Sequence, residues 1–193
     1  MLIDLGLIVL AYLLGSCSFG LLMARLYGGV DPRQSGSGNI GATNVARTVG
    51  KGAGALTLLG DCAKGIVAVA LAQWWGSSSL VSAAVALSAV LGHVFPLYHG
   101  FRGGKGMATA LGVLLPMLPL PLLGGCAVWL AVVAMWRYVS AGSILAAVAV
   151  PVLAAILAYP PPMTGAAVGI SLLVLYRHRS NMQRLLQGRE LKF

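Results

Sequence analysis

The chain has 193 residues, of which 59% are hydrophobic and only 9% are charged, and its formal net charge is +9. A soluble domain carries about 25% charged residues and could not bury this much apolar surface, so a soluble fold is excluded. The sequence predicts an all-α integral membrane protein, organised as a single polytopic domain over residues 1–193.

Apolar segments long enough to cross a bilayer, which takes about 20 residues, recur along the chain. They run roughly over residues 2–24, 53–75, 79–98, 138–158 and 163–176. The first has no basic residues before it and is longer than the apolar region of a signal peptide. We therefore expect it to be retained as a span.

Residues 107–136 form one apolar run that is too long for a single span and short for two. The stretch PMLPLP, residues 116–121, places three prolines in its middle. Because proline breaks helices, we expect two short spans that meet at a proline turn. This brings the predicted total to seven transmembrane helices.

The basic residues support seven spans. With that number, every Lys and Arg except Lys64 falls on one face of the membrane, whereas the connections GSSSL, PMLPLP and YPPPM on the other face carry no charge. By the positive-inside rule, the basic face is cytoplasmic. The sequence thus predicts a multi-pass protein of the cell (inner) membrane, with its N-terminus outside and its C-terminus in the cytoplasm.

Three polar segments interrupt this apolar pattern, all on the predicted cytoplasmic face. They are the loops at about 25–52, with SGSGNIGATN, and 99–106, with FRGGKG, and the tail 177–193. Few acidic residues accompany them, and a low-dielectric wall beside them would focus their positive field. We expect the three segments to form one site for an anion, facing the cytoplasm.

The chemistry of the two loops points to phosphate. Glycine-rich turns and helix N-termini present backbone N–H groups to phosphate, and each loop leads into an Ala-Thr step typical of a helix start. Lys105 adds a compact positive charge, and the planar guanidinium of Arg47 can donate two parallel hydrogen bonds to a phosphate. Further side-chain donors are Ser35, Ser37, Asn39, Thr43 and Asn44. Alternatively, the glycines only pack helices and the basic residues only anchor the topology; two such loops on one face favour a site.

The tail contributes His178 and Asn181, which are three residues apart and so share a helix face. The histidine could hydrogen-bond a phosphate or move a proton, or it could be an interfacial polar residue with neither role. Asp61 and Lys64, inside the second span, are expected to form a structural ion pair near its cytoplasmic end. His93 is expected to pack between helices.

No cluster of carboxylates could hold magnesium, since the chain has four acidic residues in all. The sequence therefore predicts a metal-independent protein without a cofactor. A nucleophilic Ser37 with His178 as its base is conceivable, but no third group is evident to orient the histidine. The three cysteines have no partner spacing and are expected to be small core residues.

Three segments in this order carry a family resemblance: SGSGNIGATNVARTVGK, GHVFPLYHGFRGGKGMATALG and YRHRSNMQRLLQGRE. They resemble the PlsY family, bacterial membrane glycerol-3-phosphate acyltransferases that use acyl phosphate as donor. One departure is Arg102, where the family pattern leads us to expect lysine, and it keeps the charge. The resemblance covers the whole chain and implies transfer of the acyl group to the 1-hydroxyl of glycerol 3-phosphate, giving lysophosphatidic acid and phosphate.

The resemblance also implies roles for individual residues. Those expected to hold glycerol 3-phosphate are Arg47, Lys105, Ser143, His178 and Asn181. Those expected to hold the acyl phosphate are Ser37, Gly38, Asn39, Gly41, Thr43, Asn44, Gly103 and Gly104. Lys105, His178 and Ser37 are the candidate catalytic residues. The hydroxyl proton goes either to His178 or to the donor's own phosphate, and we favour the phosphate because a histidine bound to an anion is better suited to holding.

The partners implied are the two substrates and membrane lipid, with the acyl chain lying between helices, and no nucleic acid; the protein is expected to be monomeric. The alternative function is a small-anion or organophosphate transporter. A transporter needs a midplane site that is reachable from both faces, whereas the polar groups here cluster at one face. An intramembrane serine hydrolase ranks lower still, because Ser37 lies in a loop.

Overall fold

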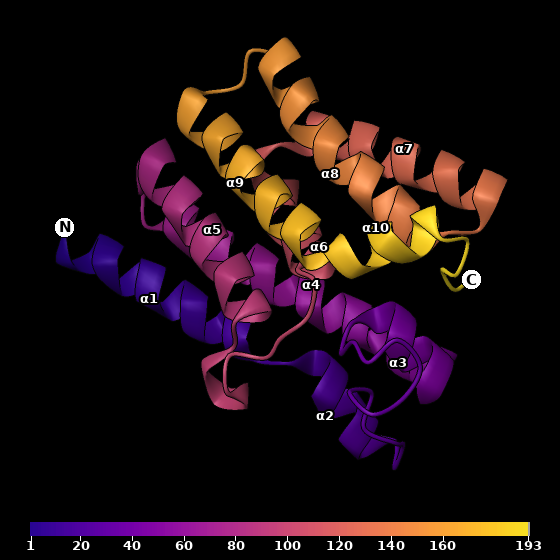
Figure 1. Ribbon diagram of the computed structural model, residues 1–193. Coiled ribbons are helices and arrows are strands. Elements are labelled where there is room, and N and C mark those ends of the chain that lie inside the picture. The colour runs from indigo at the N-terminus through magenta and orange to yellow at the C-terminus, as the bar shows by residue number, and fades with distance from the viewer. Residues whose placement is uncertain (193) are drawn as a thin grey trace.

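The computed structural model describes residues 1–192, which contain helices and no strand, so the predicted all-α class is confirmed (Figure 1). The helices in chain order are α1 (Leu2–Ser16), α2 (Phe19–Leu26), α3 (Ala42–Thr48), α4 (Lys51–Trp74), α5 (Ser79–Val94), the 3-10 turn η1 (Leu97–His99), α6 (Met107–Met117), α7 (Pro119–Trp136), α8 (Val139–Ile156), α9 (Pro161–Arg177) and α10 (Arg179–Leu186).

Five helical segments within the described residues are long and apolar enough to cross a membrane. They are Leu2–Leu26, Lys51–Trp74, Ser79–His99, Pro119–Trp136 and Val139–Ile156. The other two predicted spans are shorter, since α6 has 11 residues and α9 has 17. At 1.5 Å per residue α6 is about 17 Å long, little more than half of the hydrocarbon thickness of about 30 Å.

The expected proline turn is present between α6 and α7. Helix α6 ends at Met117, Leu118 leaves the helical conformation at φ −136° and ψ 56°, and α7 begins at Pro119. Proline is well suited to this first position, because the N–H group it lacks would have no partner within the helix. Gly106 before α6 and Val139 after α7 border one cavity, so the two helices form a hairpin whose ends return to the same side.

The first predicted span is not one continuous helix. Cys17 and Ser18 are both extended between α1 and α2, and the Ser18 hydroxyl accepts a hydrogen bond from the Leu21 N–H at 3.4 Å. The Cys17 carbonyl at the break accepts a hydrogen bond of 2.6 Å from Lys64 on α4. Figure 1 shows α2 leaving the line of α1. A local serine cap and a distant lysine thus stabilise the break.

Close glycine contacts let the helices pack as pairs, with α1 against α5, α4 against α6, and α7 against α8, while α9 packs on both α5 and α8. A Cβ on Gly92 of α5 would lie 2.2 Å from the Tyr12 carbonyl oxygen, and one on Gly112 of α6 would lie 2.0 Å from that of Cys62. Small residues allow such close approach of helices inside membranes, where dispersion replaces the hydrophobic effect between helices.

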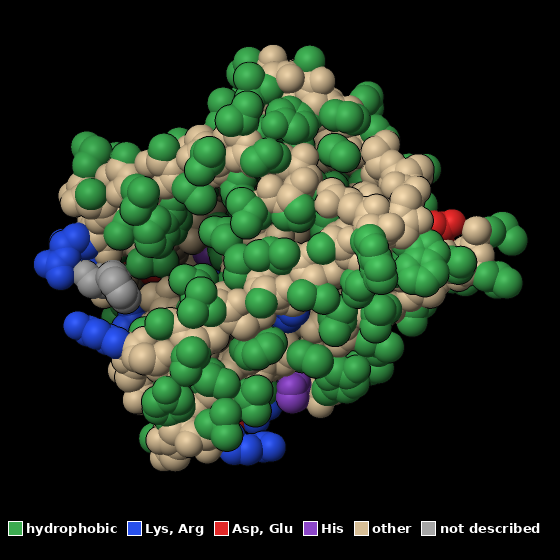
Figure 2. All heavy atoms as spheres, turned by 180° about the vertical axis from the view of Figure 1, so that it is seen from behind, with side chains coloured by type: hydrophobic (Ala, Val, Ile, Leu, Met, Phe, Trp, Pro, Cys, Tyr) green, Lys and Arg blue, Asp and Glu red, His purple; other side chains and the backbone are tan. Residues whose placement is uncertain are grey.

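The outer surface suits contact with lipid. Figure 2 shows a face covered largely by hydrophobic side chains, with Lys and Arg side chains gathered at its left and lower edges. Large apolar side chains are exposed along most of the helices, including Leu59 at 63%, Leu123 at 63% and Leu172 at 62%. An apolar surface of this extent would be a liability in water.

Candidate active site

A cavity of about 450 Å³ lies where the three polar segments meet. Its border combines residues of the stretch 37–47, of Lys105 and the first turns of α6, and of the tail between His178 and Leu191. Residues of α4, α5, α7 and α8 complete the wall. Residues of the two loops and of the tail, which are far apart in the sequence, thus border one cavity.

The loop before α3 is shaped by the buried side chain of Asn44. Its Nδ2 donates to the carbonyls of Pro32, Ser35 and Asn39 at 2.9, 3.1 and 2.8 Å, and its Oδ1 accepts from the Ser37 N–H at 2.8 Å. Asn44 borders the cavity but directs its amide into the protein. The sequence predicted that it donates to a ligand; in the structure its amide instead holds together the loop that borders the cavity.

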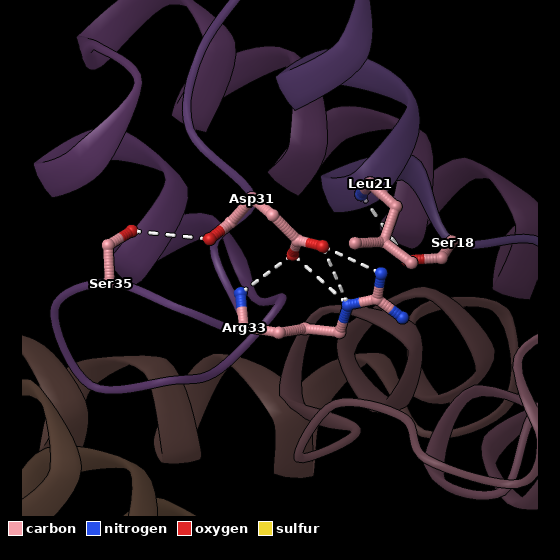
Figure 3. A network of polar contacts seen from close by, with 5 residues as sticks. All are labelled: Ser18, Leu21, Asp31, Arg33 and Ser35. Atoms are coloured by element: carbon pink, nitrogen blue, oxygen red, sulfur yellow. Dashed lines mark hydrogen bonds and ion pairs between the residues drawn. The ribbon is translucent and has the colours of Figure 1, made fainter.

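The approach to this loop is held by a second set of contacts, shown in Figure 3. The Asp31 carboxylate accepts from the Arg33 backbone N–H at 2.9 Å and from its guanidinium at 2.7 Å. The Ser35 hydroxyl donates to the Asp31 carbonyl at 3.4 Å. Gly36 and Gly38 follow with φ of 60° and 71°, a backbone region that glycine enters without strain. The protein's own contacts thus set the path of the loop.

The residues of this loop that border the cavity are Ser37, Asn39, Gly41, Thr43, Asn44 and Arg47. Gly38 does not border it. Helix α3 begins directly after Gly41, as the Ala-Thr step predicted, so the loop ends at a helix start. Polar side chains and a glycine turn therefore form one wall of the cavity.

In the second loop, only Lys105 and Gly106 reach the cavity. Gly103 and Gly104 do not border it, and their N–H groups donate to the carbonyls of Val94 and His93, both at 3.2 Å. Arg177, at the end of α9, donates to their carbonyls at 2.8 and 3.1 Å. Both glycines were predicted to offer N–H groups to a phosphate, and those groups are engaged within the protein.

Lys105 is the first member of a chain of partly buried hydrogen bonds. Its Nζ donates to the Asn181 Oδ1 at 2.6 Å, and the Asn181 Nδ2 donates to the Glu190 Oε1, also at 2.6 Å. Glu190 also accepts from the Ser140 hydroxyl at 2.8 Å and from the Arg184 Nε at 2.7 Å. The C-terminal tail is thereby fastened to α8 and α10, and it fixes the amide that receives the lysine.

The pKa values of the charged groups in this chain of hydrogen bonds are shifted by their surroundings. Burial is the main reason why the pKa of Lys105 falls to about 8. For Glu190, burial acts to raise the pKa of the carboxyl. The hydrogen bonds from Asn181, Ser140 and Arg184 outweigh burial, so that the pKa is lowered. At neutral pH the site therefore holds a charged lysine and an ionised glutamate.

His178 is neutral and has a defined tautomer. Its Nδ1 lies 2.8 Å from the Val174 carbonyl oxygen, which can only accept, so Nδ1 carries the proton and Nε2 keeps its lone pair. Burial, followed by the charge of nearby Lys105, lowers its pKa to about 4. The free nitrogen can accept a hydrogen bond from a hydroxyl, whereas the sequence left open whether this histidine binds phosphate, moves a proton or does neither.

Several residues at the cavity were not expected there from the sequence. They are Asp61, His93, Ser140, Arg184 and Glu190. For two of these residues the sequence contained a feature that could have indicated their place in the site. Ser140 precedes the predicted Ser143 by three residues and so shares its face of α8, and Glu190 is the only acidic residue of a basic tail.

The predicted ion pair of α4 is present, with the Lys64 Nζ 2.7 Å from the Asp61 Oδ1. It lies near the middle of α4 rather than at its end, and it includes His93, whose Nδ1 is 3.0 Å from the Lys64 Nζ. All three side chains are buried. Within residues 1–192, no group of three or more His, Cys, Asp or Glu side chains is arranged to hold a metal ion.

A smaller apolar cavity of about 70 Å³ lies between α6, α7, α8 and α9. It shares four wall residues with the larger cavity: Met107, Leu111, Cys126 and Trp129. Its remaining walls are almost entirely apolar, with Leu122, Val150 and Ile170 among them. The larger cavity, in which charged and polar groups join apolar walls, thus adjoins apolar space between helices, an arrangement that suits an amphiphilic molecule.

Comparison with known proteins agrees with this geometry. A family model for glycerol-3-phosphate acyltransferase matches residues 5–188. The glycerol-3-phosphate acyltransferase of Geobacter sulfurreducens is 49% identical over 193 residues, which are 100% of this chain and 99% of that protein. The enzyme of Neisseria meningitidis serogroup B is 48% identical over 189 residues, covering 96% of this chain and 94% of the relative.

Two solved structures have the same fold. The crystal structure of PlsY (YgiH), an integral membrane glycerol 3-phosphate acyltransferase, in its glycerol 3-phosphate form is 44% identical with a TM-score of 0.94, covering 98% of this chain and 95% of that one. Its lysophosphatidic acid form is 43% identical with a TM-score of 0.91 over the same shares. From its full-length relatives and its fold, the chain belongs to the PlsY family of integral membrane glycerol-3-phosphate acyltransferases.

Proposed function

We propose that the protein transfers a fatty acyl group from acyl phosphate to the 1-hydroxyl of glycerol 3-phosphate. The hydroxyl oxygen forms a bond to the acyl carbon, the bond from that carbon to the phosphate oxygen breaks, and the products are lysophosphatidic acid and inorganic phosphate. The observation that carries the proposal is one cavity lined by cationic and polar groups of three segments, with apolar space for an acyl chain beside it.

The acceptor binds at the Lys105 side of the cavity. The Lys105 ammonium and the Arg47 guanidinium neutralise the phosphate of glycerol 3-phosphate, and such charge-assisted hydrogen bonds are the strong ones. Asn181 holds Lys105 in place, and Ser143, which is 5% exposed on α8, supplies a hydroxyl at the same wall. Relatives whose crystal structures are described as glycerol 3-phosphate and lysophosphatidic acid forms support an acceptor site of this kind.

The donor binds against the loop before α3. Ser37, Asn39, Thr43 and the turn at Gly41 border the cavity there and suit the phosphate of the acyl phosphate. Its chain extends past Met107 toward the apolar cavity. Asn44, Gly38, Gly103 and Gly104 then serve the site by shaping the two loops rather than by donating to the ligand.

The proton of the attacking hydroxyl passes to the donor's own phosphate. The Nε2 of His178 accepts a hydrogen bond from the hydroxyl and so orients its oxygen toward the acyl carbon. A pKa of about 4 makes this imidazole a weak base, and the departing phosphate is the more basic group. Since the donor is already activated, proximity and neutralisation of charge supply most of the catalysis.

We also propose seven transmembrane segments, with α6 and α9 as the two short ones, the N-terminus outside and the C-terminus in the cytoplasm. Residues of the stretch 37–47, of Lys105 and of the tail border one cavity, as they must if their segments share a side. The positive-inside rule then makes that side cytoplasmic and places the protein in the inner membrane, as a single multi-pass domain.

The experiment that tests this function compares donors. Purified protein incubated with glycerol 3-phosphate should release inorganic phosphate and form lysophosphatidic acid when the donor is palmitoyl phosphate. Palmitoyl-CoA and palmitoyl carrier protein should give rates at least about tenfold lower, because the glycine loop suits a compact phosphate. Comparable rates with the thioesters would refute acyl phosphate as the donor. Omission of glycerol 3-phosphate is the control for donor hydrolysis.

Activity should not depend on a divalent metal. The chain has only four acidic residues, and charge neutralisation is assigned to Lys105 and Arg47. We expect the same initial rate with excess EDTA as with magnesium, in the phosphate-release assay with purified substrates. A rate abolished by EDTA and restored by magnesium would contradict the proposed site.

His178→Ala should raise the KM for glycerol 3-phosphate while the shape of the pH profile of kcat stays unchanged. This follows because the imidazole orients the hydroxyl without taking its proton, and loss of one neutral hydrogen bond costs about 0.5–1.5 kcal/mol, or up to roughly tenfold. His178→Gln, whose amide can also accept, is the matched control and should recover part of the loss. A collapse of kcat at saturating acceptor would instead identify His178 as the base.

A further inference from the structure

His93 lies on the last turn of α5, at the edge of the cavity, and is 4% exposed. Its Nδ1 is 3.0 Å from the Lys64 Nζ, and the same ammonium is 2.7 Å from the Asp61 Oδ1 and 2.6 Å from the Cys17 carbonyl oxygen. An ammonium can only donate hydrogen bonds. The Nδ1 of His93 therefore accepts, and its Nε2 carries the proton.

The opposite edge of this imidazole meets the second glycine loop. A Cβ built on Gly104 would lie only 2.3 Å from the His93 Nε2, so the ring rests directly against the glycine. The His93 carbonyl accepts the Gly104 N–H, and the neighbouring Val94 carbonyl accepts that of Gly103. Arg177 holds the carbonyl groups of both glycines. The segment is thus held by a ring, by two backbone bonds and by a guanidinium.

We propose that His93 is a positioning residue for Lys105, acting through the Gly103–Gly104 segment against which its ring packs. Two successive glycines have more backbone freedom than any other pair, and the backbone of Lys105 follows them directly. Without the ring, the segment loses its packing on the α5 side and can shift at Gly104, which carries the ammonium away from Asn181, to which it donates at 2.6 Å. The buried ion pair of α4 acts on the site indirectly, because Lys64 holds the imidazole of His93.

The proposal rests on the role assigned above to Lys105 in binding the acceptor phosphate. His93→Asn is the first test, because the asparagine Oδ1 can replace Nδ1 as the acceptor for Lys64 while the space beside Gly104 is vacated. We expect the KM for glycerol 3-phosphate to rise about five- to tenfold, less than for complete loss of one ionic hydrogen bond, because the ammonium is displaced and not removed. The KM for palmitoyl phosphate should stay within about twofold of its original value, since the donor loop is untouched.

A double-mutant cycle separates positioning from general structural damage. In a Lys105→Ala background, His93→Asn should leave the KM for glycerol 3-phosphate unchanged, because there is no ammonium left to position. If the two substitutions instead multiply their separate effects, the proposal is overturned. Lys105→Ala alone tests the role assigned to the lysine, and an unchanged acceptor KM in this variant refutes the proposed function. If Lys105→Ala raises the acceptor KM but His93→Asn multiplies that effect in the double variant, only the positioning role of His93 is refuted.

Gly104→Ala is a second, independent test of the proposal, and it can be used even if the His93→Asn protein does not fold. The added methyl would clash with the imidazole and displace the segment, so the acceptor KM should rise. Adding His93→Ala to Gly104→Ala removes the clashing ring and should lower the acceptor KM relative to Gly104→Ala alone. An acceptor KM that rises further in the double variant would show that the ring does not act through Gly104.

Discussion

Lys105→Ala is expected to reduce kcat/KM for glycerol 3-phosphate by at least about tenfold. We propose that this ammonium binds the acceptor phosphate, and a hydrogen bond to a charged group contributes about 1.5–3 kcal/mol, where 1.4 kcal/mol is a factor of ten. Steady-state phosphate release over a range of acceptor concentrations measures the effect. Arg102→Ala, which removes an exposed charge of the same loop outside the cavity, is the matched control and should change kcat/KM by less than about threefold.

The same lysine sets an expected pH dependence. Burial lowers the pKa of Lys105 to about 8, so the ammonium is lost as the pH rises through that value, and kcat/KM for the acceptor should fall above pH 8. The acceptor phosphate does not contribute to this fall, because its second ionisation, with a pKa of about 6, is complete by then. Lys105→Arg should recover only part of the activity, since a planar fork fits the glycine loop poorly, but its profile should stay flat above pH 8. A profile in this variant that falls like the original would assign the fall to another group.

Asp61→Ala should have the largest effect on stability, lowering the free energy of unfolding by about 3–5 kcal/mol. The substitution leaves the Lys64 ammonium buried at 6% exposure without the carboxylate now 2.7 Å away. Thermal unfolding of the purified protein in detergent should show a clearly lower Tm. The double variant Asp61→Ala, Lys64→Met should recover part of the loss, because it removes the charge as well as its partner.

The matched control is the exposed pair of Asp31 and Arg33, whose closest atoms are also 2.7 Å apart. Asp31→Ala should lower the free energy of unfolding by less than about 1 kcal/mol, because both side chains are partly solvated. Equal effects at the two aspartates would show that burial of the pair in α4 does not strengthen it. An Asp61→Ala protein as stable as the original would contradict a structural ion pair altogether.

The helices could be predicted because their signals are local. The prolines of residues 116–121 marked the turn between α6 and α7, and the structure places Pro119 at the start of α7. The break at Cys17 and Ser18 was not predicted, because apolar residues continue across it. It depends on Lys64, which is 47 residues away in the chain. A pattern of hydrophobicity cannot report a hydrogen bond of that kind.

The site could be predicted at the level of segments but not of atoms. Charge and topology were enough to bring Lys105, His178 and Asn181 together, and all three border the cavity. The direction of each donor could not be read in the same way. The amide of Asn44 folds its own loop, and the N–H of Gly104 is directed to α5. Whether a polar group faces a ligand or the protein is decided by tertiary neighbours, which the sequence does not show.

The break between α1 and α2 has a consequence for biosynthesis. A chain enters the membrane from its N-terminus, so the Cys17 carbonyl is in place before Lys64, its partner on α4, has been synthesised. Lys64 in turn gains His93 only when α5 follows, 29 residues later. Exposed polar backbone is costly in hydrocarbon, so the break between α1 and α2 is not stabilised until α4 has been inserted.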